Sequence, residues 1–200
     1  MKIFNYVPDI DPSVMWRGAF TEEELQTIDT IGEYAEFTKG VVGQGDVEGR
    51  EDLDYRDVDV TWVRPDEDNI WLFKKINELV AKINYDKFQL DLELFEGLQL
   101  SKYKSEDKGH YDWHTDISAK LDEGGNIRKL SMILMLSKPE DYEGGKLLFN
   151  LSGNQDMYTE MELNRGDILI FYSHIPHKVC DVTAGERRTL VTWVRGPKLT

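Results

Sequence analysis

Residues 129–172 read "KLSMILMLSKPEDYEGGKLLFNLSGNQDMYTEMELNRGDILIFY", and this stretch decides the fold. Its apolar or alternating runs are each only long enough for one strand, and polar turn sequences separate them. The pattern continues on either side, in "FEGLQLSKY" at 95–103 and "RRTLVTWVR" at 187–195. Short strands with frequent turns predict an antiparallel double-stranded β-helix, the jelly-roll or cupin-like fold, rather than a doubly wound α/β sheet.

Two amphipathic helices are expected before these strands. Residues 21–37, "TEEELQTIDTIGEYAEF", open with a capping box, in which Thr21 is the N-cap and Glu24 its partner three residues on. Residues 68–84, "DNIWLFKKINELVAKIN", have apolar residues at helical spacing, and Pro65 suits a helix start just before them. The apolar stripes are Leu25, Ile28 and Ile31, then Leu72, Phe73, Ile76, Leu79, Val80 and Ile83. We expect both helices to pack on the sheet, which makes the fold α+β and mainly β.

Length and composition set the domain organisation and exclude some partners. The 200 residues fit one compact unit, with 1–87 as a helical and strand extension packed on a jelly-roll core at 88–200. A net charge of −14, with the basic residues scattered, argues against a nucleic-acid partner. The single cysteine, Cys180, fits a reducing compartment. With no signal peptide and no membrane-spanning apolar run, we expect a cytoplasmic protein without a membrane partner.

Residues 44–68 are dense in acidic side chains, and two interpretations stay open. An acidic run usually forms a solvated surface, here a loop leading into the strand "DVDVTWV" at 57–63. Alternatively, residues 44–61 form a flap over a site, with Arg56 or Trp62 facing a substrate.

The stretch "HYDWHTD" at 110–116 concentrates two of the four histidines of the chain beside two aspartates. In a strand, residues i and i+2 point the same way, so His114 and Asp116 can direct an imidazole and a carboxylate into one cavity. The only histidines further along are His174 and His177, which follow an apolar strand. Two histidines and one carboxylate on one face of a metal form the facial triad of non-haem Fe(II) oxygenases. Taken alone the histidine–aspartate pair is a weak signal, because both residue types are common in polar turns.

From Leu98 to Gly196 the chain resembles the 2-oxoglutarate/Fe(II) dioxygenases of the prolyl 4-hydroxylase type, including bacterial PKHD-type hydroxylases. The similar motifs, in the order of that family, are "YDWHTD", "LSMILMLSKPEDYEGGKLLF", "RGDILIFYSHIPHKV" and "GERRTLVTW". They extend over about half the chain, and their joint spacing makes the resemblance fairly specific.

The resemblance implies roles for individual residues at the site. By position, His114, Asp116 and His177 match the Fe(II) ligands. Arg187, ten residues after His177, matches the residue that pairs with the far carboxylate of 2-oxoglutarate. A guanidinium suits this role because it binds a carboxylate through two hydrogen bonds and keeps its charge. Arg188 is the rival, and we prefer Arg187 because neighbours in a strand face opposite sides.

The resemblance also gives expectations for two tyrosines and for His174. Tyr103 matches a tyrosine whose hydroxyl hydrogen-bonds the same cosubstrate carboxylate, although the following "KSEDKGH" is longer than the turn typical of the family. Tyr111 matches an aromatic residue that lines the cosubstrate or substrate pocket, and an ordinary core tyrosine is the alternative. His174 lies in a variable turn and is expected behind the ligands or on the surface.

The resemblance further implies an oxidoreductase that uses Fe(II), 2-oxoglutarate and O2. Such a dioxygenase couples the decarboxylation of 2-oxoglutarate to succinate with hydroxylation of a C–H bond. We prefer a prolyl 4-hydroxylase-like activity on a protein or peptide, with L-ascorbic acid as a potential reductant. The alternatives are an oxygenase of a free amino acid or other small molecule, a non-catalytic jelly-roll ligand-binding module, and a metal-dependent hydrolase or isomerase on the same barrel. The sequence leaves the oligomeric state open.

Overall fold

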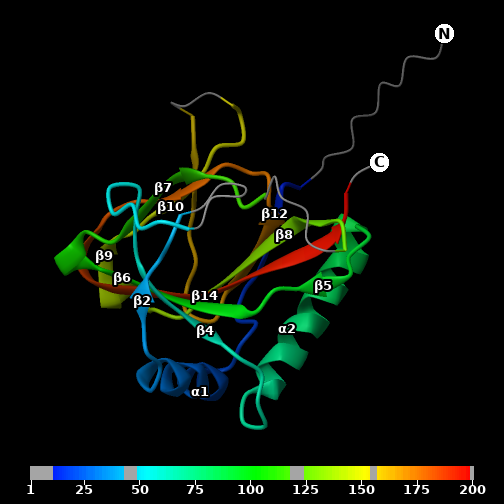
Figure 1. Cartoon of the computed structure of the whole chain (residues 1–200), viewed down its shortest axis with the longest axis horizontal. Coiled ribbons are helices and arrows are strands. Elements are labelled where there is room, and N and C mark those ends of the chain that lie inside the picture. The colour runs from blue at the N-terminus through cyan, green and yellow to red at the C-terminus, as the bar shows by residue number, and fades with distance from the viewer. Residues whose placement is uncertain (1–10, 43–48, 118–123, 154–156, 199–200) are drawn as a thin grey trace.

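Two antiparallel sheets face each other in a computed structural model that describes residues 11–42, 49–117, 124–153 and 157–198 (Figure 1). The larger sheet contains, in spatial order, β1 (Ser13–Trp16), β12 (Ile168–Tyr172), β8 (Asn126–Met135), β14 (Val182–Pro197), β6 (Leu98–Lys104), β4 (Asp59–Val63) and β2 (Thr38–Lys39), with β5 (Leu94–Phe95) and β9 (Tyr142–Gly144) also paired to β14. The smaller sheet contains β11 (Thr159–Met161), β10 (Leu147–Phe149), β13 (His177–Val179), β7 (His110–His114) and β3 (Arg56–Asp57). This arrangement confirms the predicted jelly-roll class, mainly β with helices.

Both faces of the larger sheet are buried, which explains the continuous apolar runs that the sequence shows there. Along β8, alternate residues Leu130, Met132 and Leu134 pack toward the helices, whereas Ile133 and Met135 pack toward the smaller sheet. Strand β12 divides in the same way, with Ile168 and Ile170 on the helix side and Leu169 and Phe171 between the sheets. A strand that is covered on both sides has no solvent face and therefore no polar alternation.

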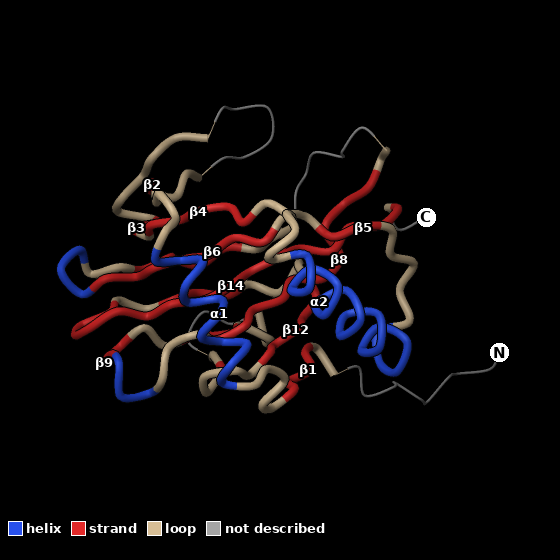
Figure 2. Tube along the Cα trace, turned by 90° about the horizontal axis from the view of Figure 1, so that it is seen from below, coloured by secondary structure: helices blue, strands red, loops and turns tan. Residues whose placement is uncertain are grey.

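The two predicted helices are confirmed, and Figure 2 shows both of them on the same face of the larger sheet. Helix α1 (Glu22–Glu33) starts with the expected capping box, in which Thr21 Oγ1 accepts from the Glu24 backbone and Glu24 accepts from the Thr21 backbone. Its residues Leu25 and Ile28 are buried against the sheet. Among the residues that the structure describes, no helix combines the length and the apolar character needed to cross a membrane.

Helix α2 (Ile70–Ile83) begins later than the position of Pro65 led us to expect. Residues 66–69 form a turn that side chains close: Asp66 Oδ1 accepts from the Asn69 backbone at 3.0 Å, and the Asn69 amide donates to the Arg64 carbonyl at 2.8 Å. Such local hydrogen bonds compete with helical ones, so the helix starts only after Asn69. At its other end α2 continues as a π-helical turn, η1 (Asn84–Phe88).

Segments on both sides of the predicted boundary at 87/88 contribute to the sheets. Strands β1, β2 and β4 extend the larger sheet and β3 extends the smaller one. The division into an extension and a core stays a prediction. The possible flap at 44–61 falls partly outside the described residues, and its described part runs through β3 into β4.

Candidate metal centre

Two strands of the smaller sheet bring the predicted histidines together. In the antiparallel pair of β7 and β13, His114 lies directly opposite His177, and their ring centroids are 4.1 Å apart. Strand β7 ends at His114, so Asp116 does not share a strand with it as we expected. Instead, the backbone N–H groups of Asp116 and Ile117 both donate to the Ser173 carbonyl, at 2.9 and 3.0 Å. These bonds fix the segment after β7 and turn the carboxylate toward the imidazoles.

The three side chains converge on one point. The Asp116 carboxylate lies 3.8 Å from His114 Nε2 and 3.5 Å from His177 Nε2. One nitrogen or oxygen atom from each of the three residues lies within 4.8 Å of the others. All three side chains are largely buried, so the cluster is not a chance gathering of surface charges.

Backbone carbonyls orient both imidazoles for metal binding. His114 Nδ1 lies 2.7 Å from the Asp112 carbonyl, and His177 Nδ1 lies 2.9 Å from the Ile175 carbonyl. Because a carbonyl only accepts, each Nδ1 carries the proton and each Nε2 keeps its lone pair. Metal-binding histidines are held in this way. Two imidazole nitrogens and one carboxylate suit Fe(II) among the divalent ions.

Two buried serines hold the carboxylate. Ser131 Oγ donates to Asp116 Oδ2 at 2.7 Å, and Ser173 Oγ lies 3.0 Å from Ser131 Oγ. Burial alone would raise the pKa of Asp116, but His177, His114 and the Ser131 hydrogen bond lower it below its usual value. The group is therefore a carboxylate at neutral pH, as a metal ligand has to be. Sequence reasoning missed these serines, although Ser131 is a polar residue in an otherwise apolar run.

Removing the hydroxyl that supports Asp116 should weaken metal binding. We expect Ser131→Ala to lower the affinity for a divalent metal by about tenfold or more, because residues that orient a ligand typically contribute that much. Ser137→Ala is the matched control: this serine is also buried near the end of β8, but it bonds the Glu186 carbonyl and the Arg188 backbone instead. Titration with Co(II), followed by its visible absorption, measures both variants. Equal losses in the two would contradict a specific role for Ser131.

The protonation of His114 should make the metal-free protein sensitive to acid. Burial, with the neighbouring His177, lowers the pKa of His114 from 6.5 to about 3. Between these values the unfolded chain binds one proton more than the folded one, so this group costs about 1.4 kcal/mol of unfolding free energy per pH unit as the pH falls. Urea unfolding across this window should show a shallower pH dependence for His114→Asn. An unchanged slope would show that His114 is not buried in its neutral form.

A buried arginine, Arg187, lies on the inner face of β14, and none of the described carboxylates pairs with it. Arg187 is 2% exposed, and its Nε makes no hydrogen bond within the described part of the chain. Gly145, at φ +57°, makes room for it, because a Cβ there would lie 2.9 Å from Arg187 Cδ. An unpaired buried charge is costly, so an anion would complete this site. Arg188 faces the other side, where it pairs with Asp29 at 2.9 Å.

Tyr103 lies beside this arginine. It is the cross-strand partner of Arg187 on β6, and the Arg187 guanidinium carbon lies 5.4 Å from its ring centroid. Burial raises the pKa of Tyr103, and the charges of Arg187 and Asp116 both act on its hydroxyl. Tyr103 is therefore close enough to feel the charges of both the arginine and the carboxylate of the cluster. The long turn after it contains a 3₁₀ helix, η2 (Ser105–Asp107), without displacing Tyr103 from the sheet.

Tyr111 and His174 have different surroundings. The Tyr111 ring stacks on His114 with a centroid distance of 3.5 Å and an interplanar angle of 12°, and burial raises its pKa to about 12. It thus contacts a candidate ligand directly. His174 is exposed and stacks on Tyr172 at 5.4 Å, so it belongs to the surface.

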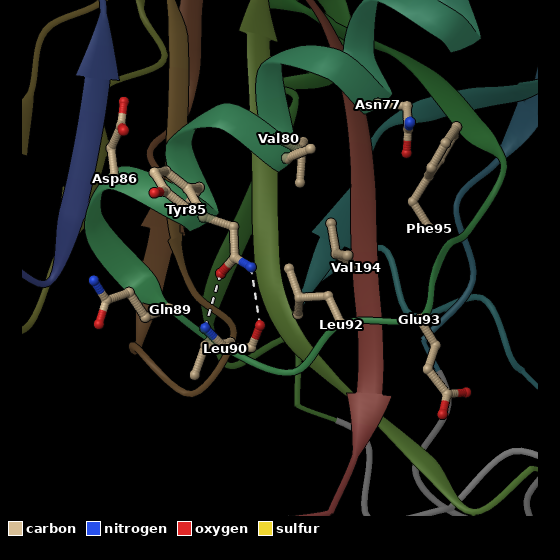
Figure 3. Close-up of a pocket in the computed structure, with 12 residues that line it drawn as sticks. Asn77, Val80, Tyr85, Asp86, Gln89, Leu90, Leu92, Glu93, Phe95 and Val194 are labelled. Carbon is tan, nitrogen blue, oxygen red and sulfur yellow. Dashed lines mark hydrogen bonds between the residues drawn. The ribbon is translucent and has the colours of Figure 1, made fainter.

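A groove elsewhere on the protein contains none of the predicted site residues. Its wall consists of the end of α2, η1 and the segment up to Phe95 (Figure 3). There the Asn84 amide closes a loop through two hydrogen bonds with the Leu90 backbone, at 2.9 and 3.0 Å. We assign it no part in the chemistry of the metal centre.

The candidate metal ligands and Arg187 all lie in a segment that matches one known protein family. The model of the 2OG-Fe(II) oxygenase superfamily matches residues 98–195. A PKHD-type hydroxylase of Colwellia psychrerythraea is 40% identical over 86 residues, which cover 43% of this chain and 37% of that protein. A second one, of Maricaulis maris, is 40% identical over 72 residues, 36% of this chain and 32% of that protein. The chain thus spans about a third of the length of these curated relatives.

Solved structures resemble the chain over nearly its whole length. A prolyl-4-hydroxylase of Pseudomonas putida has a TM-score of 0.70 at 18% identity, covering 94% of each chain. A prolyl hydroxylase of Trichoplax adhaerens, in complex with a peptide fragment of the hypoxia inducible factor oxygen degradation domain, has a TM-score of 0.72 at 15% identity, covering 92% of this chain and 83% of that one. At these identities the likeness concerns the fold.

Proposed function

We propose that this chain, whose residues 98–195 belong to the 2OG-Fe(II) oxygenase superfamily, is an Fe(II)- and 2-oxoglutarate-dependent hydroxylase. One observation carries the proposal: His114, Asp116 and His177 converge with both Nε2 atoms directed at the carboxylate. Arg187, which is buried and has no carboxylate partner among the described residues, supports it, because a non-catalytic module that binds no cosubstrate would have no use for this charge.

The three converging residues would hold the metal on one face. The chemistry that Fe(II) supplies when bound is the coupling of O2 reduction and 2-oxoglutarate decarboxylation, which yields succinate and CO2, to hydroxylation of a C–H bond. Among the described residues no fourth ligand joins these three, so a bound metal would have positions left for the cosubstrate. The protein contributes fixed geometry: backbone carbonyls hold the two imidazoles, and Ser131 holds the carboxylate.

Arg187 and Tyr103 would bind the other end of 2-oxoglutarate. The Arg187 guanidinium can take up the far carboxylate through charge-assisted hydrogen bonds, which strengthen where water is excluded. Because burial raises the pKa of Tyr103, its hydroxyl keeps its proton and can donate to the same carboxylate. Tyr111, stacked on His114, would form a side wall of the pocket.

For the substrate we propose a prolyl residue in a protein or peptide. The names of the structural relatives, one of them solved with a peptide, support this substrate class. Trp193, the cross-strand neighbour of Ser131, is largely buried, and the ring of Trp62, which is 48% exposed, lies 6.1 Å from it. Such an aromatic surface can pack against an extended chain. A free amino acid or other small molecule is the alternative, and the use of ascorbate and a cytoplasmic location stay predictions.

Succinate release with and without O2 tests the proposed activity. The wild-type protein, supplied with Fe(II) and 2-oxoglutarate, should form succinate only in the presence of O2, and candidate prolyl peptides should stimulate it and gain one oxygen atom in mass. A hydrolase or isomerase would work without O2 and form no succinate. A ligand-binding module would form none under any condition, and either result would end the proposal.

A further inference from the structure

Arg56 is connected to the candidate metal centre through one intermediate side chain, Tyr111. It lies on β3, directly opposite Tyr111 on β7, and its guanidinium carbon is 4.6 Å from the centroid of the Tyr111 ring. The same ring stacks on His114 at 3.5 Å. Guanidinium, phenol ring and imidazole therefore form a continuous series of contacts that ends on a candidate metal ligand.

The position of Arg56 is fixed from several sides. Its Nη1 donates to the Val41 carbonyl at 2.7 Å, and its Nη2 donates to Gln99 Oε1 at 3.2 Å. Gln99 belongs to β6, so this side chain links the two sheets. Gly40 gives it room, because a Cβ at that position would lie 2.9 Å from Arg56 Nε.

Arg56 pairs with none of the described carboxylates, although it lies in the most acidic part of the chain. Within the described ranges no carboxylate lies within ion-pair distance of it, and its buried Nε has no hydrogen-bond partner there. Nearby Arg50, by contrast, pairs with Asp52 at 3.2 Å and has a largely exposed side chain. The interaction that Arg56 does make is with the face of Tyr111, as a cation–π contact.

We propose that Arg56 is a positioning residue of the metal centre, which holds Tyr111 against His114 so that His114 Nε2 stays directed at Asp116 and His177. The inference rests on the metal site of the proposed function. A histidine side chain rotates about two bonds, and the single hydrogen bond at Nδ1 leaves part of that freedom. A ring stacked on one face removes it before the metal arrives, and pre-ordering of this kind strengthens binding.

The test measures Co(II) affinity by visible absorption, which needs neither O2 nor a substrate. We expect Arg56→Met to weaken Co(II) binding by about tenfold and to alter the absorption band, since cation–π and stacking contacts have about this strength. Arg56→Lys keeps a positive charge over the ring but loses the pair of guanidinium hydrogen bonds to Val41 and Gln99. Its Co(II) affinity should therefore lie between those of the wild type and Arg56→Met. Arg50→Met, which removes an exposed arginine from the same segment, should bind Co(II) like the wild type.

A double-mutant cycle shows whether Arg56 acts through Tyr111. If it does, Arg56→Met should add little to the loss caused by Tyr111→Leu, whereas independent effects would add. Additive losses would overturn the proposal. Unchanged Co(II) affinity in Arg56→Met would also overturn it, and so would tighter binding, which is expected if Arg56 only repelled the cation. Thermal unfolding checks that the variants fold. If Arg56→Met does not fold, the cycle is measured with Arg56→Lys and Tyr111→Leu instead. Failure of the wild type itself to bind Co(II) would instead refute the metal centre.

Discussion

Replacing His177 with alanine is expected to abolish metal binding and, with it, all succinate formation. Among the described residues, His177 is one of three side chains that converge in the cluster, and its Nε2 lies 3.5 Å from the Asp116 carboxylate. Without it, His114 and Asp116 alone cannot enclose a metal ion on one face. The loss of affinity should exceed the roughly hundredfold upper range found for residues that only support a ligand.

His174→Ala is the matched control for this variant. His174 lies three residues earlier, in the turn before β13, but it is exposed and stacks on Tyr172 instead of facing the cluster. We expect this variant to bind metal and to form succinate like the wild type. Co(II) titration and the anaerobic visible absorption with Fe(II) and 2-oxoglutarate measure both proteins. Retained binding in His177→Ala, or an equal loss in His174→Ala, would show that the metal lies elsewhere.

The parts of the structure that the sequence predicted are those with a local physical signature. The start of α1 was predictable because the capping box of Thr21 and Glu24 lies within four consecutive residues. Strands β6, β8, β12 and β14 of the larger sheet were visible as short apolar runs, because both faces of the sheet are covered there. The cluster of His114, Asp116 and His177 was assembled from motif order, and the register of β7 and β13 agrees with it.

The remaining features depend on contacts between distant parts of the chain. Ser131 and Ser173 meet beside Asp116 only because β8 and β12 are neighbours, and their spacing of 42 residues carries no periodic signal. The contact of Arg56 with Tyr111 depends on the pairing of β3 with β7 in the same way. The delayed start of α2 has another cause, because the Asx-type turn at Asp66 competes with the helix. Which polar side chains meet in these positions depends on the register of the paired strands, and a single sequence does not specify that register.

Arg187→Met is expected to reduce the affinity for 2-oxoglutarate by about a hundredfold, which corresponds to ~2.7 kcal/mol and is typical of a lost partner in a buried charge pair. Arg188→Met is the matched control, because Arg188 is the next residue in the strand and its guanidinium pairs with Asp29 on the other side of the sheet. Isothermal titration of the metal-loaded, anaerobic proteins with 2-oxoglutarate measures both. If Arg188→Met lost the affinity and Arg187→Met kept it, the assignment of the strand faces to the cosubstrate would be wrong.

The same variant separates a functional arginine from a structural one. In the ligand-free protein the Arg187 guanidinium is buried, and its Nε has no partner in the part of the chain that is described. A buried charge that lacks its counter-ion destabilises the fold, so Arg187→Met should leave the free energy of unfolding unchanged or raise it. An arginine that served the core would show the opposite, with lost stability and intact cosubstrate affinity. Urea unfolding of the ligand-free proteins, set beside the titrations, therefore shows whether this charge is retained for an incoming carboxylate.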